Sequence, residues 1–216
     1  MQDKSLYDVN TAGMESVLST NKVLKNTYML LGMTLLFSAV TAGISMAMGL
    51  PHGAALILTL VGFGLLFVVN RMADSSKGLI AIFAFTGVMG ASIGPMLNYY
   101  LSMPGGPALV MQALGGTAVV FFGLSAYALT TRKDFSFMGG FLMVGLLVAV
   151  VAMIANIFLA IPALSLTISA AVVMIMSGLI LFDTSRIING GETNYIRATV
   201  SLYLNIYNLF IHMLHL

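Results

Sequence analysis

A stripe of polar side chains follows the last apolar segment of the chain, and its residue types suit the handling of a proton or a cation. Ser201, Asn205, Asn208, His212 and His215 recur at intervals of four, three, four and three residues, which places them on one side of a helix. Within a membrane such side chains face a neighbouring helix or a wet cavity. Two interpretations stay open: hydrogen bonds between helices, at about 0.6 kcal/mol each, or a route for a proton or cation.

Asp183 is the carboxylate with the strongest claim to chemistry. It stands at the end of an apolar segment, with Arg186 three residues later, so one interpretation is an ion pair at a helix end. The other is a titratable cation ligand at the inner mouth of a pore. Because calcium takes roughly six to eight oxygen ligands, Asp183 would need carbonyls, Asn205 and water to complete a site. We expect no resident metal and no cofactor.

A serine also stands in a pattern known from hydrolases. Gly90, Ser92 and Gly94 match G-x-S-x-G, which in hydrolases exposes the serine on a turn between a strand and a helix. No strand is predicted here, and only His212 or His215 could serve as a base. Closely spaced glycines allow helices to approach one another, so we interpret the pattern as packing and expect no enzymatic activity.

The composition sets the environment in which these residues must work. The 216 residues are 59% hydrophobic and only 7% charged, and their mean hydropathy is +1.02. Soluble domains draw about a quarter of their residues from the charged types. A net charge of +2 is too small for a nucleic-acid footprint, and the absence of Cys excludes disulfides and thiol catalysis. The sequence therefore predicts an integral membrane protein.

The spacing of charges and prolines predicts how the chain crosses the bilayer. A hydrocarbon core of about 30 Å takes roughly 20 apolar residues, and three of the four charge-free intervals are two spans long with a proline near the middle. This predicts an all-α membrane protein with seven transmembrane helices, in which three hairpins surround a central C-terminal helix. The predicted spans are 27–48, 53–70, 79–101, 108–130, 137–159, 163–183 and 198–216.

The basic residues predict an orientation and set the first segment apart. All 9 Lys and Arg residues lie before the first span or in the second, fourth and sixth connections, and cytoplasmic segments retain positive charge. We therefore predict a cytoplasmic N-terminus and a C-terminus on the opposite face. Residues 1–25 are predicted to form a flexible cytoplasmic tail before a membrane domain of 26–216. The candidate contacts for a soluble partner in this tail are Lys4, Asp8, Glu15 and Lys22.

The C-terminal stretch from Phe182, FDTSRIINGGETNYIRATVSLYLNIYNLFIHML, resembles the signature of the Bax inhibitor motif family. The features that carry this resemblance are Asp183 at the end of the sixth helix, Gly191 before the pair Tyr195 and Ile196, and the run 202–210. The segments AYALTTRKDFSFMGG from Ala126, ANIFLAIPAL from Ala155 and GGETNYIRATVSLY from Gly190 resemble a bacterial inner-membrane subgroup of that family.

Two functions are implied by this resemblance. The bacterial subgroup implies an inner-membrane protein that associates with the membrane-anchored AAA protease FtsH, both as a poor substrate and as a modulator. The polar composition of residues 1–25 independently makes this tail the segment that we expect the protease to engage. Other family members imply a pH-sensitive leak of calcium or protons that uses two aspartates, and these map to Asp183 and Asn205. Because an amide cannot share a proton as a second carboxylate does, the resemblance implies a weakened leak for this chain.

Overall fold

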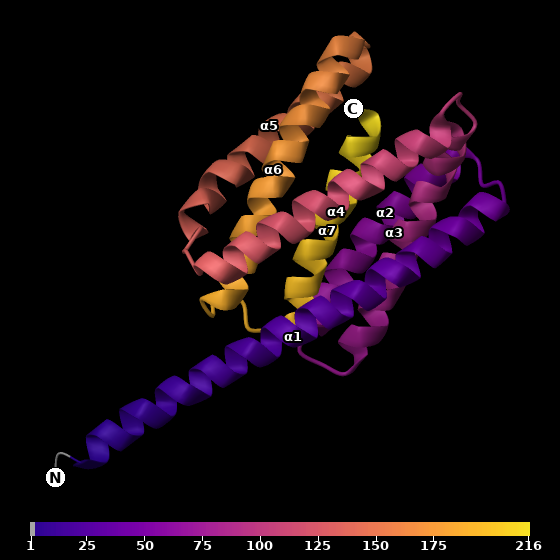
Figure 1. Ribbon diagram of the computed structural model, residues 1–216. Coiled ribbons are helices and arrows are strands. Elements are labelled where there is room, and N and C mark those ends of the chain that lie inside the picture. The colour runs from indigo at the N-terminus through magenta and orange to yellow at the C-terminus, as the bar shows by residue number, and fades with distance from the viewer. Residues whose placement is uncertain (1–2) are drawn as a thin grey trace.

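The computed structural model describes the backbone of residues 3–216 and the side chains from Leu18 onward, and it confirms the predicted all-α fold (Figure 1). Within this part of the chain there are seven α-helices and no strand. The helices are α1 (Asp3–Ala47), α2 (His52–Met72), α3 (Lys77–Leu101), α4 (Gly106–Thr131), α5 (Gly139–Leu159), α6 (Pro162–Ile188) and α7 (Tyr195–His215), with a short 3₁₀ helix, Ser136–Met138, before α5.

Six of the seven helices are long and apolar enough to cross a membrane. In the described part of the chain these are α1 from Leu18 onward, α2, α3, α4, the segment Ser136–Leu159 and α6. The last helix, α7, has 21 residues and the length for a span, but its amides and imidazoles lower its hydropathy. It depends on its neighbours, rather than on lipid, for its apolar contacts.

Two helix boundaries differ from the predicted spans for a physical reason. The first span is predicted from residue 27, whereas α1 is helical from Asp3, because composition marks where lipid begins and does not mark where hydrogen bonding of the backbone begins. Likewise α6 continues to Ile188, so Asp183 lies inside this helix and not at its end. The flexibility predicted for residues 1–25 stays a prediction.

The connections divide the bundle into two ends that differ in charge. The connections α2–α3, α4–α5 and α6–α7, with the adjoining helix turns, carry Arg71, Lys77, Arg132, Lys133, Arg186 and Arg197; we call this the charged end. The connections α1–α2, α3–α4 and α5–α6 contain no Lys, Arg, Asp or Glu. We call this the uncharged end, and the C-terminus of α7 lies there as well (Figure 1).

The last helix occupies the centre of the bundle, as the sequence predicts. Within the described chain α7 packs on α6, α1 and α4 and touches α3 and α2, and in Figure 1 it passes behind α4. Its side chains Leu202 and Leu209 are fully buried. The chain neighbours α1 and α2 both pack on α3 instead of on each other.

The glycines of α3 explain how closely this helix approaches α1. A methyl group built on Gly90 would overlap the backbone of Ser38, and one on Gly94 would overlap the side chain of Ser45. The predicted role of these glycines in packing is therefore confirmed. At this approach Ser38 and Ser45 donate hydrogen bonds to the α3 carbonyls of Thr86 at 2.5 Å and Ala91 at 2.7 Å.

Candidate functional site

Asp183 and Asn205 lie side by side across the interface between α6 and α7. Asn205 Nδ2 donates a hydrogen bond to Asp183 Oδ2 at 2.7 Å. Asn205 is buried, with 5% of its surface exposed, and Asp183 is half-buried. The structure thus brings together two candidate residues that the sequence separates by 22 positions.

The chemistry of this pair follows from its composition. A carboxylate that accepts from an amide has one titratable group, and the amide keeps its two protons, so the pair cannot share a proton as two carboxylates do. The described residues contain no group of three or more His, Asp or Glu side chains that could hold a metal ion. A cation at Asp183 would depend on carbonyls and water for its remaining ligands.

Arg186 has partners other than Asp183. Its guanidinium donates to the carbonyl of Gly191 at 3.2 Å, lies 3.9 Å from the carboxylate of Glu192 and stacks 5.6 Å from the ring centroid of Phe182. The ion pair considered between Asp183 and Arg186 is therefore not formed, and Arg186 instead contacts Gly191 and Glu192 of the α6–α7 connection and Phe182 of α6. The reason is that α6 continues past Asp183 and carries Arg186 out to the charged end.

The polar stripe on α7 divides into parts with different partners. Asn208 donates to the carbonyl of Leu204 in its own helix at 2.9 Å. His212 Nδ1 lies 3.2 Å from Ser169 Oγ of α6. His215 is exposed, and its ring meets that of Tyr100 edge-on at 5.9 Å.

The two histidines line a hollow at the uncharged end of the bundle. A cavity of about 460 Å³ lies between α5, α6 and α7, and His212 and His215 form one wall of it. The facing walls include Asn156 and Ser165, whose side chains are hydrogen-bonded to each other at 2.6 Å, and Ser169. His212 and His215 are thus the stripe residues that border a hollow at the uncharged end, and apolar side chains of α5, α6 and α7 line much of the rest of it.

Apolar side chains separate this cavity from the Asp183 pair. Val172, Met176 and Ile180 follow one another at helical spacing on α6 between Ser169 and Asp183, and each is no more than 3% exposed. Together with the fully buried Leu209 on α7, they interrupt the polar lining. The five stripe residues thus do not form one continuous polar channel in this conformation.

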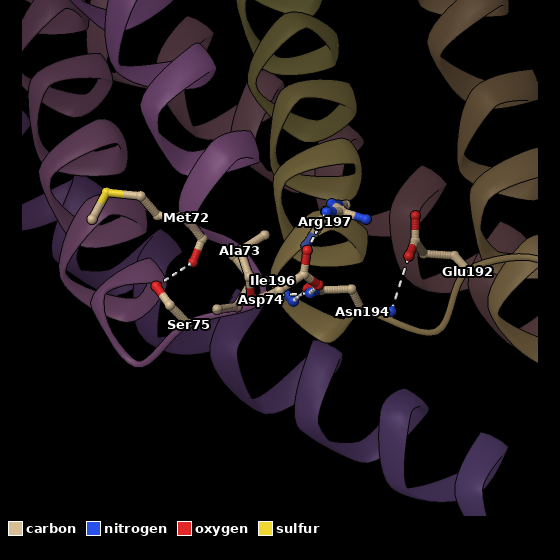
Figure 2. A network of polar contacts seen from close by, with 8 residues as sticks. All are labelled: Met72, Ala73, Asp74, Ser75, Glu192, Asn194, Ile196 and Arg197. Carbon is tan, nitrogen blue, oxygen red and sulfur yellow. Dashed lines mark hydrogen bonds and ion pairs between the residues drawn. The ribbon is translucent and has the colours of Figure 1, made fainter.

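A third polar cluster, at the charged end, was missed by sequence reasoning (Figure 2). Asn194 accepts hydrogen bonds from the backbone N–H groups of Ile196 and Arg197 at the start of α7, at 2.9 and 3.1 Å. Its amide donates to the carbonyl of Ala73 and to Asp74, at 2.9 and 2.8 Å. Arg197 is 2.6 Å from the same Asp74. We call Asp74, Asn194 and Arg197 the charged-end network.

The signal for this network was present in the sequence in part. Asparagine is a favoured residue directly before a helix, and Asn194 precedes Tyr195, the first residue of α7. What no spacing indicates is that the α2–α3 connection with Asp74 lies next to it. The network ties the first half of the chain to the last helix.

Two tyrosines of α7 are also buried partners that the polar stripe did not predict. Tyr203 OH lies 2.6 Å from Ser38 Oγ, and Tyr207 OH lies 2.9 Å from Ser92 Oγ. Ser92 donates to the carbonyl of Met89 at 2.7 Å as well. In this arrangement the serine of the G-x-S-x-G pattern serves helix packing, while His212 is bonded elsewhere.

The candidate partner residues of the tail have little structural description. Lys4, Asp8 and Glu15 lie outside the residues whose side chains are described, although the helix that carries them projects beyond the bundle (Figure 1). Lys22 is exposed on α1. Neither a flexible tail nor partner binding is tested by these observations.

The sequence of the chain matches one protein family and several known bacterial membrane proteins. Residues 20–216 match the family described as inhibitor of apoptosis-promoting Bax1. The chain is 58% identical over 200 residues to the modulator of FtsH protease YccA of Escherichia coli K12, covering 92% of this chain and 90% of the relative. The same figures relate it to the inner membrane protein YccA of E. coli O6:H1. A membrane protein of Vibrio cholerae serotype O1 is 53% identical over 205 residues, or 94% of this chain and 92% of that protein.

Proposed function

The chain belongs to the Bax inhibitor family, and on that premise we propose that it is an inner-membrane modulator of the protease FtsH, which grips it by its N-terminal segment. The observation that carries the proposal is the 58% identity to a modulator of that protease across 92% of the chain. The identity extends over almost the whole membrane domain and is not confined to one motif.

The length of α1 supports a role for its first turns as a handle. The helix has 45 residues, which is about 68 Å at 1.5 Å per residue, whereas the hydrocarbon core is about 30 Å thick. The charge-free, apolar part of α1 begins only at Asn26, so residues 3–17, which make up roughly 22 Å of helix, lie well before the part that lipid surrounds. Figure 1 shows these turns clear of the other helices, where an ATP-driven protease has access to them.

The packing of α1 supports resistance to extraction. A pull on the handle acts on a helix that interlocks with the glycines of α3 and that is bonded to α7 through Ser38 and Tyr203. In addition, each spanning helix satisfies its own backbone hydrogen bonds, and unwinding it in lipid exposes them. A protease that grips the handle is therefore occupied without rapid degradation of its substrate.

The proposal includes an orientation, which rests on the basic residues. The charged end carries the Lys and Arg residues of the connections, and short cytoplasmic loops retain such residues. We place the charged end and the handle in the cytoplasm, and the C-terminus of α7 on the opposite face. The catalytic part of the proposed partner must then work on the cytoplasmic side.

The direct test is deletion of residues 3–17, with membrane insertion and helix content verified. We expect loss of co-purification with FtsH and loss of FtsH-dependent turnover. A matched control replaces these residues by a scrambled sequence of the same composition. Turnover is restored if the protease requires only a segment of this length, and it is not restored if the protease recognises Lys4, Asp8 or Glu15. Unchanged association and turnover after the deletion would contradict the proposal.

A second candidate function is ion conduction, which is favoured by one contact. Asp183 lies against Asn205 at 2.7 Å within the membrane domain, and intramembrane carboxylates mark ion and proton pathways. Liposome flux of calcium or protons tests it. A protein with Asp183→Ala that leaks as fast as the parent would remove Asp183 from the pathway, and a parent without flux would remove the candidate function.

A further inference from the structure

A small hollow lies at the charged end of the bundle, between α1, the end of α4 and the start of the α6–α7 connection; we call it the charged-end hollow. Its volume is about 210 Å³. Thr20 and Asn21 of α1 line one side of it, and Arg132 at the end of α4 lines another, together with Asn189 and Gly190 after α6. Three segments that are far apart in sequence thus place polar groups around one space.

The lining of this hollow changes from polar to apolar toward the membrane. Its apolar part is formed by Leu24 of α1, Leu129 of α4 and Ile188 of α6. Leu24 follows the polar lining residues of α1 as that helix runs into the bundle, whereas Leu129 and Ile188 precede those of their own segments as α4 and α6 leave it. A ligand here meets apolar groups on the side of the hydrocarbon layer and polar groups on the side of the water, as a lipid head group does where it joins its acyl chains.

Most hydrogen-bond donors around the hollow are unused. Among the described residues, the guanidinium of Arg132, the amide of Asn21 and the hydroxyl of Thr20 have no hydrogen-bond partner or ion pair. Only the amide of Asn189 is engaged, and it donates to Ser185 Oγ at 3.2 Å. A guanidinium presents five N–H donors in a planar fork, which matches two oxygens of a phosphate group.

The charge around the hollow favours an anion. The chain segments that line it contain Lys22 and Arg132 but no Asp or Glu; they are 20–24, 129–132 and 188–190. Lys25 and Lys133 directly follow two of these segments. The carboxylate of Asp134 accepts a hydrogen bond from the first N–H group of the 3₁₀ helix at 2.8 Å. Basic pockets between transmembrane helices bind the head groups of anionic lipids.

Helix capping does not account for the side chain of Arg132. A cation near the C-terminus of a helix is favourable, but the last carbonyls of α6 are bonded to the backbone N–H groups of Asn189, Gly190 and Gly191, and that of Ala128 in α4 to the N–H of Arg132 itself. The backbone of Arg132 has φ +50°, a conformation that glycine usually supplies at a helix end, as Gly190 does after α6 with φ +74°. A glycine would therefore fit this backbone better, and no polar contact of the described chain explains the arginine.

We propose that the charged-end hollow binds the phosphate group of an anionic phospholipid of the surrounding bilayer. Arg132 and Asn21 donate to the phosphate oxygens, and Leu24, Leu129 and Ile188 contact the glycerol and the first carbons of the acyl chains. The proposal depends on the membrane domain alone and not on the protease or on ion conduction. Inorganic phosphate offers the same oxygens without the apolar part, so the experiment must separate the two sources.

Two adjacent basic residues provide a matched test. Arg132→Gln and Lys133→Gln each remove one positive charge from an exposed residue, but only Arg132 lines the hollow. The parent and both variants are titrated in detergent with phosphatidylglycerol, and bound lipid is counted by native mass spectrometry. Phosphatidylcholine, whose head group carries a positive charge beside the phosphate, is the neutral lipid probe, and inorganic phosphate is the soluble probe.

We expect phosphatidylglycerol to bind about tenfold more weakly to Arg132→Gln than to the parent, because a hydrogen bond to a charged group is lost, and Lys133→Gln to change the affinity by less than about twofold. Equal losses in the two variants would show a response to surface charge only and would overturn the proposal. Binding of inorganic phosphate that depends on Arg132, without such binding of phosphatidylglycerol, would also overturn it. Unchanged lipid binding with loss of FtsH co-purification in Arg132→Gln would assign the hollow to a protein partner instead.

Arg132→Gly tests the same site through stability. This change relieves the backbone strain at φ +50° but adds freedom to the unfolded chain, and these two effects oppose each other, so the variant folds. A ligand that binds only the folded state raises the unfolding temperature. We expect the unfolding temperatures of the parent and of Lys133→Gln to rise when phosphatidylglycerol replaces phosphatidylcholine in lipid nanodiscs, and that of Arg132→Gly to stay unchanged. An equal rise in all three proteins would overturn the proposal.

Discussion

The two ends of α7 differ in how their polar side chains are engaged. At the charged end, Asn194, Arg197 and Asn205 each contact a residue of another element, in the α2–α3 connection or on α6. Toward the uncharged end, Asn208 bonds to its own helix, and His212 has one polar contact beside a cavity of about 460 Å³. Apart from Tyr207, which is bonded to Ser92, the last turns of α7 are therefore held more loosely than its start, so motion of α7 is expected to be largest near His215.

The strongest way to break this contrast is Asn194→Ala. The change removes the cap of α7 and the bonds to Ala73 and Asp74, which costs about 2 kcal/mol of unfolding free energy and lowers the unfolding temperature by roughly 4 to 8 °C. Thermal unfolding in lipid nanodiscs measures it. Asn208→Ala, which loses only a bond within its own helix, is the control, and equal losses in the two variants would refute the contrast.

The second prediction concerns pH and uses Asn205→Asp. Two carboxylates at the 2.7 Å of the present contact share a proton at low pH and repel each other once both are ionised. Because the folded state then binds the proton more tightly than the unfolded state, stability is present at low pH and is lost as the pH rises, by about 1 to 2 kcal/mol between roughly pH 5 and pH 8. Thermal unfolding across this range measures it.

The matched control for this prediction exchanges the two residues. The double variant Asp183→Asn with Asn205→Asp restores one carboxylate and one amide, so the added slope of stability against pH disappears. If proton or calcium flux is also measured, Asn205→Asp is expected to make it more dependent on pH. An Asn205→Asp protein whose stability has the same pH dependence as the parent would show that the two side chains separate in the membrane.

A smaller effect is expected at the loosely held end. His212→Ala loses a single contact of 3.2 Å with Ser169 beside an existing cavity, so we expect a loss of about 0.6 kcal/mol. A double-mutant cycle with Ser169→Ala isolates this contact. A loss as large as that of Asn194→Ala would show that the uncharged end is anchored as firmly as the charged end.

The smallest expected change in stability concerns the ion pair of the charged-end network, considered apart from its hydrogen bonds. Arg197 and Asp74 are 42% and 70% exposed, and an exposed ion pair is worth about 0.5 kcal/mol. Asp74→Asn keeps an acceptor for Asn194, so only this ionic part is lost, and the variant loses less stability than the parent when salt is raised. An effect comparable to Asn194→Ala, insensitive to salt, would mean that the acceptor geometry was lost as well.

The sequence predicted the features that depend on transfer of apolar segments into lipid more accurately than those that depend on contacts between particular side chains. The helices beginning at His52 and Lys77 lie within two residues of the predicted spans, because prolines and charges mark where apolar sequence stops. The ion pair of Asp183 with Arg186, one of the two interpretations left open, is not formed, since α6 continues past Asp183 and Arg186 contacts Gly191 and Glu192. The partners of Tyr203 and Tyr207 were not predicted. In sequence a tyrosine in an apolar helix looks like another apolar residue, and only the structure shows that serines of α1 and α3 lie next to the two hydroxyl groups.

The sequence by itself determined the membrane environment, the number of helices and the family. These follow from the requirement that an apolar layer of about 30 Å be crossed by roughly 20 residues at a time. Only the tertiary structure decided that Asn205 meets Asp183 and that Asn194 meets the α2–α3 connection. Hydrogen bonds form only within about 3 Å, and which side chains come that close depends on how the helices cross, which their spacing in sequence does not specify.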